Sequence, residues 1–246
     1  MMHLFVIMAL SGHQPAIQPR TPVLIELFTS EGCSSCPPAD ALLAKLLEGQ
    51  PVAGVEIIPL AFHVDYWDRL GWKDPYSSSE FTRRQQEYSA IFGADRVYTP
   101  QLVVDGAAEL VGSDERLALE AIGKAAAQPR LPVAVNASVH GSDAIRIAVE
   151  GPGRADRTEA IDIVAVLVED RLVSAIRRGE NSGKTLSHSA VVRRHQVVGT
   201  LEREPFVGEG EWRLNKTWVR ENLRVIAFVQ GRKTRRIYGA VSAPIR

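Results

Sequence analysis

Cys33 and Cys36 are the residues whose type and spacing most clearly support chemistry in this 246-residue chain. They are its only cysteines, so a structural disulfide between distant segments is excluded. The two residues between them let the sulfurs close a small disulfide loop. If a helix begins there, its unpaired N–H groups and positive dipole end favour a thiolate. We expect Cys33 to be the exposed attacking thiol and Cys36 to resolve the mixed disulfide.

The same two thiols leave a metal-binding interpretation open. A structural zinc site usually needs four nitrogen or sulfur ligands, and the sequence has no second CxxC and no HxxxH motif. Two thiolates suit Cu(I) better, because this ion prefers soft ligands. His63 is then the candidate third ligand. An inert pair of cysteines is the remaining alternative.

The segments around the cysteines predict a strand–helix–strand unit. Residues 23–28 form a short, partly β-branched apolar run that is typical of a buried strand. Residues 37–47 predict a helix, because prolines stand at the front, leucines recur at helical spacing and Gly49 follows. Residues 55–62 predict a second strand, so the two strands should pair in parallel through a right-handed crossover.

Pro37 determines where the helix should begin. Because proline lacks an N–H, we expect the helix to start at Pro37, with Cys36 near its cap. Cys33 then lies slightly outside the helix, where the dipole is weaker, so its thiol should ionise less readily. Ser34 and Ser35 supply hydroxyl groups but no fixed charge.

Thr99–Pro100 is the second anchor of the predicted site. It stands after a helix predicted over residues 79–92 and before a hairpin predicted around Asp-Gly at 105–106, where two short apolar runs flank the turn. A further helix is predicted over residues 113–127. A cis peptide is a minority state even before proline, so the local sequence leaves an ordinary trans bond open.

The second half has a different pattern. A linker is expected over residues 128–132, and no helical pattern of useful length follows it. Strands separated by turns are predicted instead, over residues 133–139, 144–149, 161–168, 191–198, 223–229 and 237–241. The predicted fold class is therefore an α/β domain over residues 21–128, followed by a smaller all-β antiparallel sandwich or barrel over residues 132–246.

Several segments carry a resemblance to known families. They are residues 26–40, 63–68 with 71–75, 98–101 and 178–181. In the order of its motifs, the stretch from 22 to 127 resembles a thioredoxin-like domain. The whole chain more closely resembles a bacterial family of exported thioredoxin-like proteins of unknown function. The resemblance implies thiol–disulfide oxidoreductase activity, a cis Thr99–Pro100 bond facing the CxxC, and Thr99 against the disulfide, where it can contact a bound peptide. Thioredoxin itself has Gly-Pro between its cysteines, so its redox potential does not carry over to this Ser-Ser spacer.

Glu26 lies inside the first predicted strand. The resemblance implies a buried carboxylate that relays a proton to Cys36, although the spacing to Cys33 is one residue longer than in thioredoxin. A charged group in a buried strand is costly without a partner. The alternative is a position at the strand's edge or end, exposed to water.

The loop from His63 to Asp68 is dense in possible ligands and aromatic residues. His63, Asp65 and Asp68 alternate with Tyr66 and Trp67, and they follow a strand whose carboxyl end should lie near the CxxC. Three interpretations stay open: a metal site with the cysteines, an aromatic wall for a substrate, and a packed loop whose polar groups satisfy the backbone.

Residues 178–181, Arg-Gly-Glu-Asn, form a polar turn in the second half. These residues could cover the CxxC surface or bind a partner. A turn held together by its own hydrogen bonds is the alternative.

The distribution of charge and the first 20 residues give indications of binding partners and cellular location. Residues 1–130 carry 10 Lys and Arg against 16 Asp and Glu, a net −6, and the remaining residues carry 19 against 13, a net +6. The scattered arginines match no nucleic-acid recognition motif. Residues 1–20 contain an apolar run too short for a membrane span, which predicts a signal peptide or a disordered leader. With the resemblance, this favours an exported, periplasmic protein without membrane insertion, and leaves a cytoplasmic location open.

The resulting hypothesis is a thiol–disulfide oxidoreductase acting on protein or small-molecule thiols and disulfides outside the cytoplasm, with no cofactor. Cys33 attacks, Cys36 resolves, and the backbone near Thr99–Pro100 holds a substrate strand by edge pairing. The alternatives are a Cu(I) metallochaperone or redox sensor, and a non-catalytic binding module.

Overall fold

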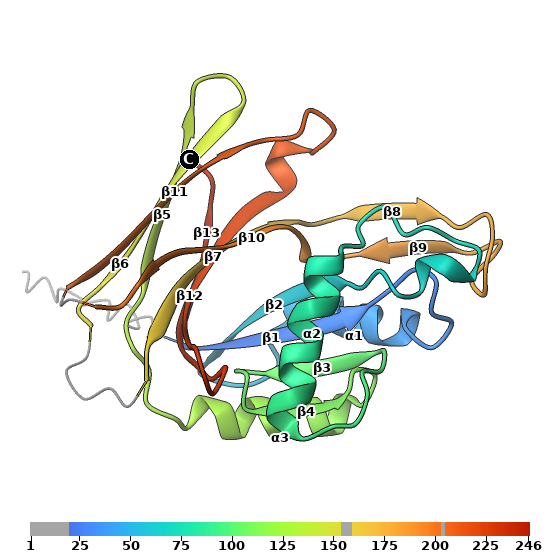
Figure 1. Cartoon of the computed structure of the whole chain (residues 1–246), viewed down its shortest axis with the longest axis horizontal. Helices are drawn as coiled ribbons and strands as arrows, with labels where there is room; N and C mark the ends of the chain where they lie inside the picture. Colours follow the sequence, from blue (N-terminus) through green and yellow to red (C-terminus); the bar gives the residue numbers. More distant parts are fainter. Residues whose placement is uncertain (1–19, 154–158, 203–204) are drawn as a thin grey trace, which may run out of the picture.

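The computed structural model describes residues 20–153, 159–202 and 205–246, so the predicted leader lies outside the described residues apart from its last position. Within these ranges the chain forms three α-helices and thirteen β-strands (Figure 1). The helices are α1 (Pro37–Gly49), α2 (Ser79–Phe92) and α3 (Glu115–Ala126). The strands are β1 (Thr21–Thr29), β2 (Val55–His63), β3 (Gln101–Val104), β4 (Ala108–Val111), β5 (Ala134–His140), β6 (Ala144–Gly151), β7 (Ile161–Glu169), β8 (Leu172–Ala175), β9 (Thr185–His188), β10 (Val191–Thr200), β11 (Phe206–Arg213), β12 (Leu223–Gly231) and β13 (Ile237–Pro244).

One mixed sheet of eight strands runs through both halves of the chain. Its order is β13-β12-β7-β10-β2-β1-β3-β4. β1 and β2 pair in parallel, as expected for the strand–helix–strand unit, and β10 joins β2 in parallel at Val191 and Ala61. The predicted fold class, an α/β domain followed by a separate all-β sandwich or barrel, is therefore wrong. The boundaries at 128 and 132 fall between α3 and β5, and as limits of independent folding units they stay a prediction.

The reason for this error lies in β7 and β12. All nine residues of β7 and eight of the nine residues of β12 are buried, so neither strand has the solvent-facing side that a small isolated sandwich would give it. On β7, Val164 and Val166 face a core shared with Phe28 and Phe62 of the first half. The alternate residues face a second core, which the three-stranded sheet β11-β6-β5 closes. Because β7 and β12 are covered on both faces, they lie inside the eight-stranded sheet and not in a separate sandwich.

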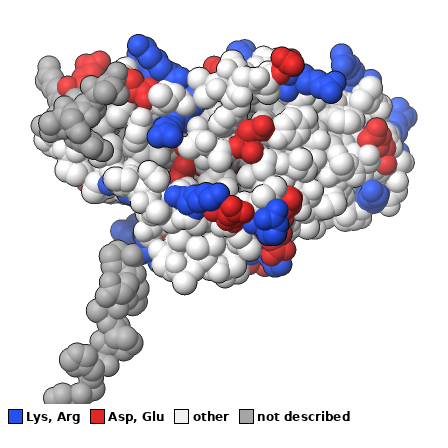
Figure 2. Space-filling view, turned by 90° about the horizontal axis from the view of Figure 1, so that it is seen from below, with Lys and Arg blue, Asp and Glu red and all other residues white. Residues whose placement is uncertain are grey.

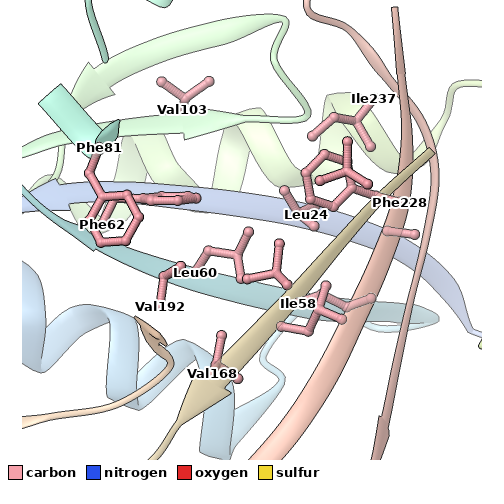
Figure 3. Packing of buried hydrophobic residues seen from close by; sticks show 14 of the residues in the cluster. Leu24, Ile58, Leu60, Phe62, Phe81, Val103, Val168, Val192, Phe228 and Ile237 are labelled. Carbon is pink, nitrogen blue, oxygen red and sulfur yellow. The ribbon is translucent and has the colours of Figure 1, made fainter. Parts of the chain in front are cut away.

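The core that joins the two halves is shown in Figure 3. Phe62 stacks on Phe28 with ring centroids 5.5 Å apart and meets the edge of the Phe81 ring at 5.2 Å. Leu24 and Phe228, from β1 and β12, belong to the same cluster. Because these side chains are fully or almost fully buried, the position of β1 depends on packing against strands more than 130 residues later in the chain.

The helices cover opposite faces of the β1–β2–β3 part of the sheet. α1 and α3 pack on the face that carries Ile25 and Leu27, whereas α2 packs on the face of Leu24 and Phe28. This alternation follows from the two-residue period of a strand. α1 begins at Pro37 with Cys36 as its N-cap, as the prolines predict. The CxxC is therefore held at the carboxyl end of β1, where the chain turns into α1.

A separate two-stranded hairpin, β8–β9, reaches back to this end of the sheet (Figure 1). β9 packs against α1, and its last residue is the buried His188. The sequence pattern predicted most of the long strands of the second half but missed β8, β9 and β11. The missed hairpin brings second-half residues to the CxxC.

Charges of both signs are mixed on the face of the molecule shown in Figure 2. On that face Lys and Arg side chains lie among Asp and Glu side chains, with wide uncharged areas between them. Among the described residues, no helix combines the length and apolar character needed to cross a membrane.

Candidate active site

The two cysteines form a disulfide at the mouth of α1, with their Cα atoms 5.4 Å apart. Both residues have an exposed fraction of 0%, whereas Ser34 and Ser35 between them are exposed. The expectation that Cys33 is exposed is therefore wrong for the disulfide form. The turn around the disulfide presents its two serines to solvent and keeps both sulfurs inside.

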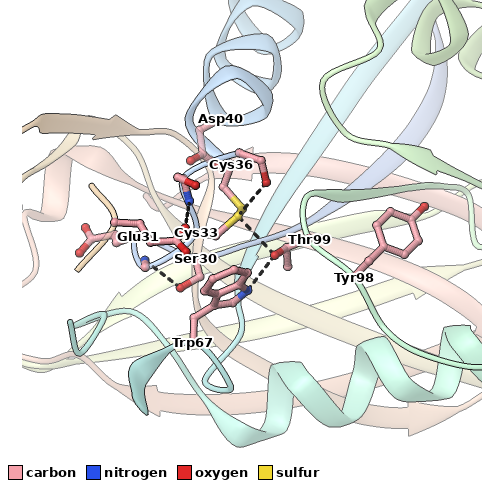
Figure 4. The surroundings of a disulfide bond; sticks show 12 residues. Ser30, Glu31, Cys33, Cys36, Asp40, Trp67, Tyr98 and Thr99 are labelled. Carbon is pink, nitrogen blue, oxygen red and sulfur yellow. Dashed lines mark hydrogen bonds between the residues drawn. A yellow bond between two sulfur atoms is a disulfide. The ribbon is translucent and has the colours of Figure 1, made fainter. Parts of the chain in front are cut away.

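The sulfur of Cys33 lies beside two hydroxyl groups. Thr99 Oγ1 is 3.4 Å from Cys33 Sγ and donates to it, and Ser35 Oγ is 3.3 Å away. Trp67 Nε1 donates to Thr99 Oγ1 at 2.8 Å, which occupies an acceptor position of that hydroxyl and directs its proton toward the sulfur. Figure 4 shows Trp67 and Thr99 on one side of the disulfide and Glu31 on the other. The Thr99–Pro100 peptide bond is cis, as the resemblance implied.

The start of α1 offers the sulfurs few backbone donors. Pro37 and Pro38 have no N–H group, and the N–H groups of Ala39 and Asp40 both bond to the carbonyl of Cys36, at 2.8 and 3.1 Å. The N–H of Cys36 bonds to the carbonyl of Cys33 at 3.2 Å. A thiolate at Cys33 would therefore be stabilised by side-chain hydroxyl groups rather than by these helix N–H groups.

The turn between β8 and β9 is bonded directly to the CxxC loop. Asn181 Nδ2 donates to the carbonyls of Glu31 and Cys33, both at 2.9 Å. Glu180 Oε2 accepts the N–H of Ser34 at 3.0 Å. Lys184 Nζ donates to Asn181 Oδ1 at 2.9 Å and so orients the amide. Of the interpretations left open for residues 178–181, the structure supports covering the CxxC loop.

The shape of this turn depends on Gly179. Its φ of +77° is in the left-handed region that favours glycine, and a Cβ there would meet Trp72 Cβ at 3.2 Å. Backbone hydrogen bonds from Ile176 to Lys184 and from Gly183 to Ile176, both at 2.9 Å, close the turn. The Arg-Gly-Glu-Asn sequence therefore brings Glu180 and Asn181 to the CxxC loop in a fixed conformation.

Five buried ionisable residues lie next to the disulfide loop, and we call them the acid–histidine cluster. They are Glu31, Asp40, His63, Asp74 and His188. His63 Nδ1 is 2.7 Å from Asp74 Oδ2, and His188 Nε2 is 3.1 Å from Glu31 Oε1. His188 Nδ1 lies 3.9 Å from Asp40 Oδ2, which connects β9 to α1.

Three members of this cluster, His63, Asp74 and Asp40, have shifted protonation equilibria. Burial alone would lower the pKa of His63, but the charge and hydrogen bond of Asp74, with the charges of Asp40 and Glu31, raise it. Burial favours a higher pKa for Asp74, yet His63 and the N–H groups of Glu31 and Tyr76 lower it. Burial raises the pKa of Asp40 despite the opposing charge of His188. These shifts favour the charged forms of both His63 and Asp74, and Asp40 holds its proton more tightly than an exposed aspartate does.

Glu26 lies in a different buried group, which we call the sheet-centre group: Glu26, Arg84, Tyr88 and Gln230. Arg84 Nε donates to Glu26 Oε2 at 2.5 Å, and the Tyr88 hydroxyl donates to the other carboxylate oxygen. Arg84 Nη1 donates to Gln230 Oε1 at 3.1 Å. Glu26 is therefore buried, and its carboxylate is bonded to side chains of α2 and not to the disulfide.

The loop after His63 is packed through its own polar groups. Thr82 Oγ1 donates to Asp65 Oδ1 at 2.5 Å, and Asp68 Oδ1 accepts the N–H of Asp74 at 3.2 Å. Trp67 reaches Thr99, as described above, so part of this loop does support the CxxC. In the described part of the chain, no three His, Cys, Asp or Glu side chains are grouped in a way that could hold a metal ion.

Comparison with known proteins identifies the family. A family model described as a protein of unknown function (DUF1223) matches residues 24–230, and the chain belongs to this family. A crystallised protein from Agrobacterium tumefaciens is 28% identical, with a TM-score of 0.67 over 90% of this chain and 93% of that one. HBP35 of Porphyromonas gingivalis is 16% identical and shares the fold, with a TM-score of 0.64 over 92% of this chain and 76% of that one. No curated protein is similar enough to this chain to count as a match.

The site therefore includes residues that the sequence did not single out as site residues. They are Glu31, Asp40 and Asp74. Glu180 and Asn181 lie in the polar turn at 178–181, for which covering the CxxC surface was one of the interpretations left open. His188 and Asn181 lie about 150 residues after the CxxC, and only the position of the β8–β9 hairpin brings them to it.

Proposed function

We propose that this protein carries out thiol–disulfide exchange at Cys33 and Cys36. The observation that carries the proposal is the CxxC disulfide with the Thr99 and Ser35 hydroxyls on Cys33 Sγ. These groups lie where negative charge develops on Cys33 Sγ when the substrate–Cys33 disulfide breaks, and such hydrogen bonds strengthen with charge. No described contact places an equivalent pair of hydroxyl groups on Cys36.

The exchange has two balanced steps. A substrate thiolate attacks Cys33 Sγ, a substrate–Cys33 disulfide forms, and the Cys33–Cys36 bond breaks to leave a thiolate on Cys36 that takes up a proton. A second substrate thiolate then attacks the substrate sulfur of this mixed disulfide and releases Cys33 as a thiolate. The substrate pair is oxidised to a disulfide and the protein is reduced to a dithiol. The reverse sequence starts with attack by Cys33 and ends with resolution by Cys36.

Access to Cys33 requires a local movement, since its sulfur is buried in the disulfide form. Ser35 is exposed and its hydroxyl is the neighbour of Cys33 Sγ on the solvent side of the turn. Rotation of this side chain would open the shortest approach. Trp67 and Thr99, which hydrogen-bond to each other, would stay in place and orient the incoming sulfur.

Asp40 is the carboxyl group best placed to exchange a proton with Cys36. It lies four residues after Cys36 on α1, so both side chains point along the same face of the helix. Its raised pKa lets it hold a proton nearer neutral pH than an exposed aspartate would. Glu26, the carboxylate that the resemblance suggested for this role, is occupied by Arg84 and Tyr88.

The substrates that fit this proposal are thiols and disulfides of proteins or small molecules, and the proposed location is outside the cytoplasm. The apolar run near the start of the sequence supports export. Fractionation of cells that produce the full-length chain tests the location, and recovery of the protein in the cytoplasm alone would contradict it.

Turnover of a dithiol substrate tests the reaction. The oxidised protein should convert dithiothreitol to its disulfide in the presence of a terminal oxidant such as oxidised glutathione, and Cys33→Ser should abolish this turnover. Asp40→Asn should slow it by about tenfold or more, because the group that exchanges a proton with Cys36 is lost. Ser182→Ala, in the exposed turn, serves as a matched control and should react like the wild type. If Cys33→Ser keeps the wild-type rate, the proposal is wrong.

A further inference from the structure

Glu180 is an exposed carboxylate bonded to the backbone of the residue that follows Cys33. Its Oε2 accepts the Ser34 N–H at 3.0 Å, and in the described part of the chain Ser34 is the group to which this carboxylate is bonded. We infer that Glu180 is a positioning residue that restrains ionisation of the Cys33 thiol in the dithiol form, so that the second half of the chain sets the reactivity of the CxxC. This inference deepens the proposed function and rests on it.

The first part of the argument concerns donors. In the dithiol form, a thiolate at Cys33 needs hydrogen-bond donors near the start of α1. Pro37 and Pro38 provide none, and the N–H groups of Ala39 and Asp40 are directed to the carbonyl of Cys36. The Ser34 N–H is adjacent to the sulfur-bearing residue, and Glu180 occupies it. A backbone donor that could have served the thiolate serves a carboxylate instead.

The second part of the argument concerns charge. A carboxylate next to Cys33 opposes formation of a second negative charge nearby. Hydrogen bonds from Ser34 lower the pKa of Glu180, so its carboxylate is ionised well below neutral pH. Two unit charges a few ångströms apart in a largely aqueous setting interact strongly enough to move a titration midpoint by about 0.5 to 1 pH unit.

The third part concerns how the carboxylate is held. Asn181, the next residue, is fully buried and its amide is bonded to the Glu31 and Cys33 carbonyls. Gly179, the preceding residue, has the left-handed backbone that the turn requires. Glu180 therefore sits between a fixed glycine turn and a fixed amide. Its position over the CxxC loop is therefore set by the fold of the turn.

Other charged groups also surround Cys33. On the buried side they are Glu31 and Asp40, which are negative when ionised, with His63, Asp74 and His188 behind them. On the turn they are Arg177, Arg178 and Lys184, all exposed. Lys184 is bonded to the Asn181 side-chain oxygen. Glu180 differs from these groups because its charge is both exposed and hydrogen-bonded to the CxxC backbone, so it can be removed without disturbing the buried cluster.

Alkylation of Cys33 as a function of pH tests the inference. In a Cys36→Ser background Cys33 is the sole thiol of the chain, and its thiolate displaces iodide from iodoacetamide to form a stable thioether. The glutamine in Glu180→Gln can still accept the Ser34 N–H but carries no charge. The midpoint of the pH–rate profile should fall by about 0.5 to 1 pH unit, and the rate at a pH below both midpoints should rise about 3- to 10-fold.

Two comparisons separate charge from structure. Glu48→Gln removes an exposed carboxylate from the far end of α1 and should leave the profile unchanged. Salt provides a second measurement that needs no change at Glu180: raising ionic strength from about 0.01 M to about 1 M should lower the midpoint of the Cys36→Ser protein toward that of the Glu180→Gln form. A structural role alone would not produce this salt dependence.

Coincident profiles with and without the Glu180 charge, and a midpoint insensitive to salt, would overturn the inference. This failure is distinct from failure of the proposed function. Turnover of dithiothreitol that depends on Cys33 could persist while Glu180 has no effect. Conversely, a shifted alkylation profile without any turnover would leave Glu180 as a determinant of Cys33 reactivity and contradict the exchange reaction.

Discussion

The sheet-centre group and the acid–histidine cluster are two buried polar regions that solve the problem of burying charge differently. In the first, Glu26 and Arg84 neutralise each other, and Tyr88 and Gln230 complete the hydrogen bonds. In the second, three carboxyl groups face two histidines. His63 Nε2 and His188 Nδ1 are buried there without a hydrogen-bond partner among the described residues.

The difference indicates which region is structural and which belongs to the site. A closed ion pair with all its hydrogen bonds made has little capacity to take up or release a proton, so it holds α2 to the sheet. A cluster that has more carboxyl groups than histidines, and ring nitrogens without hydrogen-bond partners, can take up or release a proton while its other hydrogen bonds stay in place. The second region also contacts the CxxC loop through Glu31 and Asp40, and the first does not.

The largest effect should come from breaking the sheet-centre group. Arg84→Met leaves Glu26 buried without a counter-charge and should lower the free energy of unfolding by about 3 to 5 kcal/mol, measured by urea denaturation. The double variant Glu26→Gln with Arg84→Met removes both charges and should recover most of this loss.

The Glu26→Gln change also tests whether the sheet-centre group influences the cysteines. In Glu26→Gln, the pH dependence of Cys36 alkylation, measured in a Cys33→Ser background, should match that of the wild-type Glu26 form. A shifted profile would mean that Glu26 acts on Cys36 after all and that the two buried regions are not functionally separate.

A smaller effect is expected from Asn181→Ala. The change leaves the carbonyls of Glu31 and Cys33 without the donor that bonds them to the β8–β9 turn. We expect a loss of about 2 kcal/mol in the free energy of unfolding and faster reduction of the disulfide by dithiothreitol. Ser182→Ala, one residue later, should stay within about 0.5 kcal/mol of the wild type. Equal stability of the two variants would show that the turn is not bonded to the CxxC loop in solution.

The smallest effect is a pH dependence of stability that originates in His63 and Asp74. The pKa of His63 is raised above its ordinary 6.5, so the stabilisation it provides is fully present below pH 6.5 and is lost as the pH rises through the folded-state value. The pKa of Asp74 is lowered below 3.8, so its contribution is present above pH 3.8 and is lost as the pH falls through its folded-state value. Asp40 adds a separate loss of stability, which begins as the pH rises above 3.8 and is complete once the pH has passed its raised folded-state pKa.

Urea denaturation at a series of pH values checks this prediction. His63→Asn can still donate to Asp74 but cannot become charged, so the part of the alkaline decline due to His63 should disappear in that variant. An unchanged slope above pH 6.5 in His63→Asn would assign the decline to other groups, and the proposed ion pair would be wrong.

Local sequence was sufficient for the parts of the fold that local physics determines. Apolar runs and prolines predicted β1, α1 starting at Pro37, β2 and their parallel pairing. It was insufficient where strands of the second half join the first. β10 meets β2 through a single residue pair, Val191 and Ala61, and no periodicity in either strand indicates this partner.

In the candidate site, too, some residues could be predicted from the sequence and others depend on tertiary contacts. Cys33 and Cys36 could be predicted from their spacing, and the place of Thr99 beside them from the resemblance to a known family. Glu26 could not be assigned correctly, because its partner Arg84 stands on a helix whose polar residues are expected to face solvent. Covering of the CxxC by residues 178–181 was one of several interpretations, and local sequence could not decide between them, because a contact across about 150 residues depends on the tertiary position of a short hairpin.

Trapping of mixed disulfides in paired cysteine variants tests the central claim most directly. Each variant is produced as the full-length chain, and disulfide-linked partners are identified by mass spectrometry after thiols are blocked with N-ethylmaleimide. The account predicts that Cys36→Ser accumulates partners bonded to Cys33, because the resolving thiol is missing. Cys33→Ser should accumulate few or none, since Cys36 is buried without the hydroxyl neighbours of Cys33. Equal trapping by both variants, or trapping through Cys36 alone, would contradict the assignment of Cys33 as the sulfur that meets the substrate.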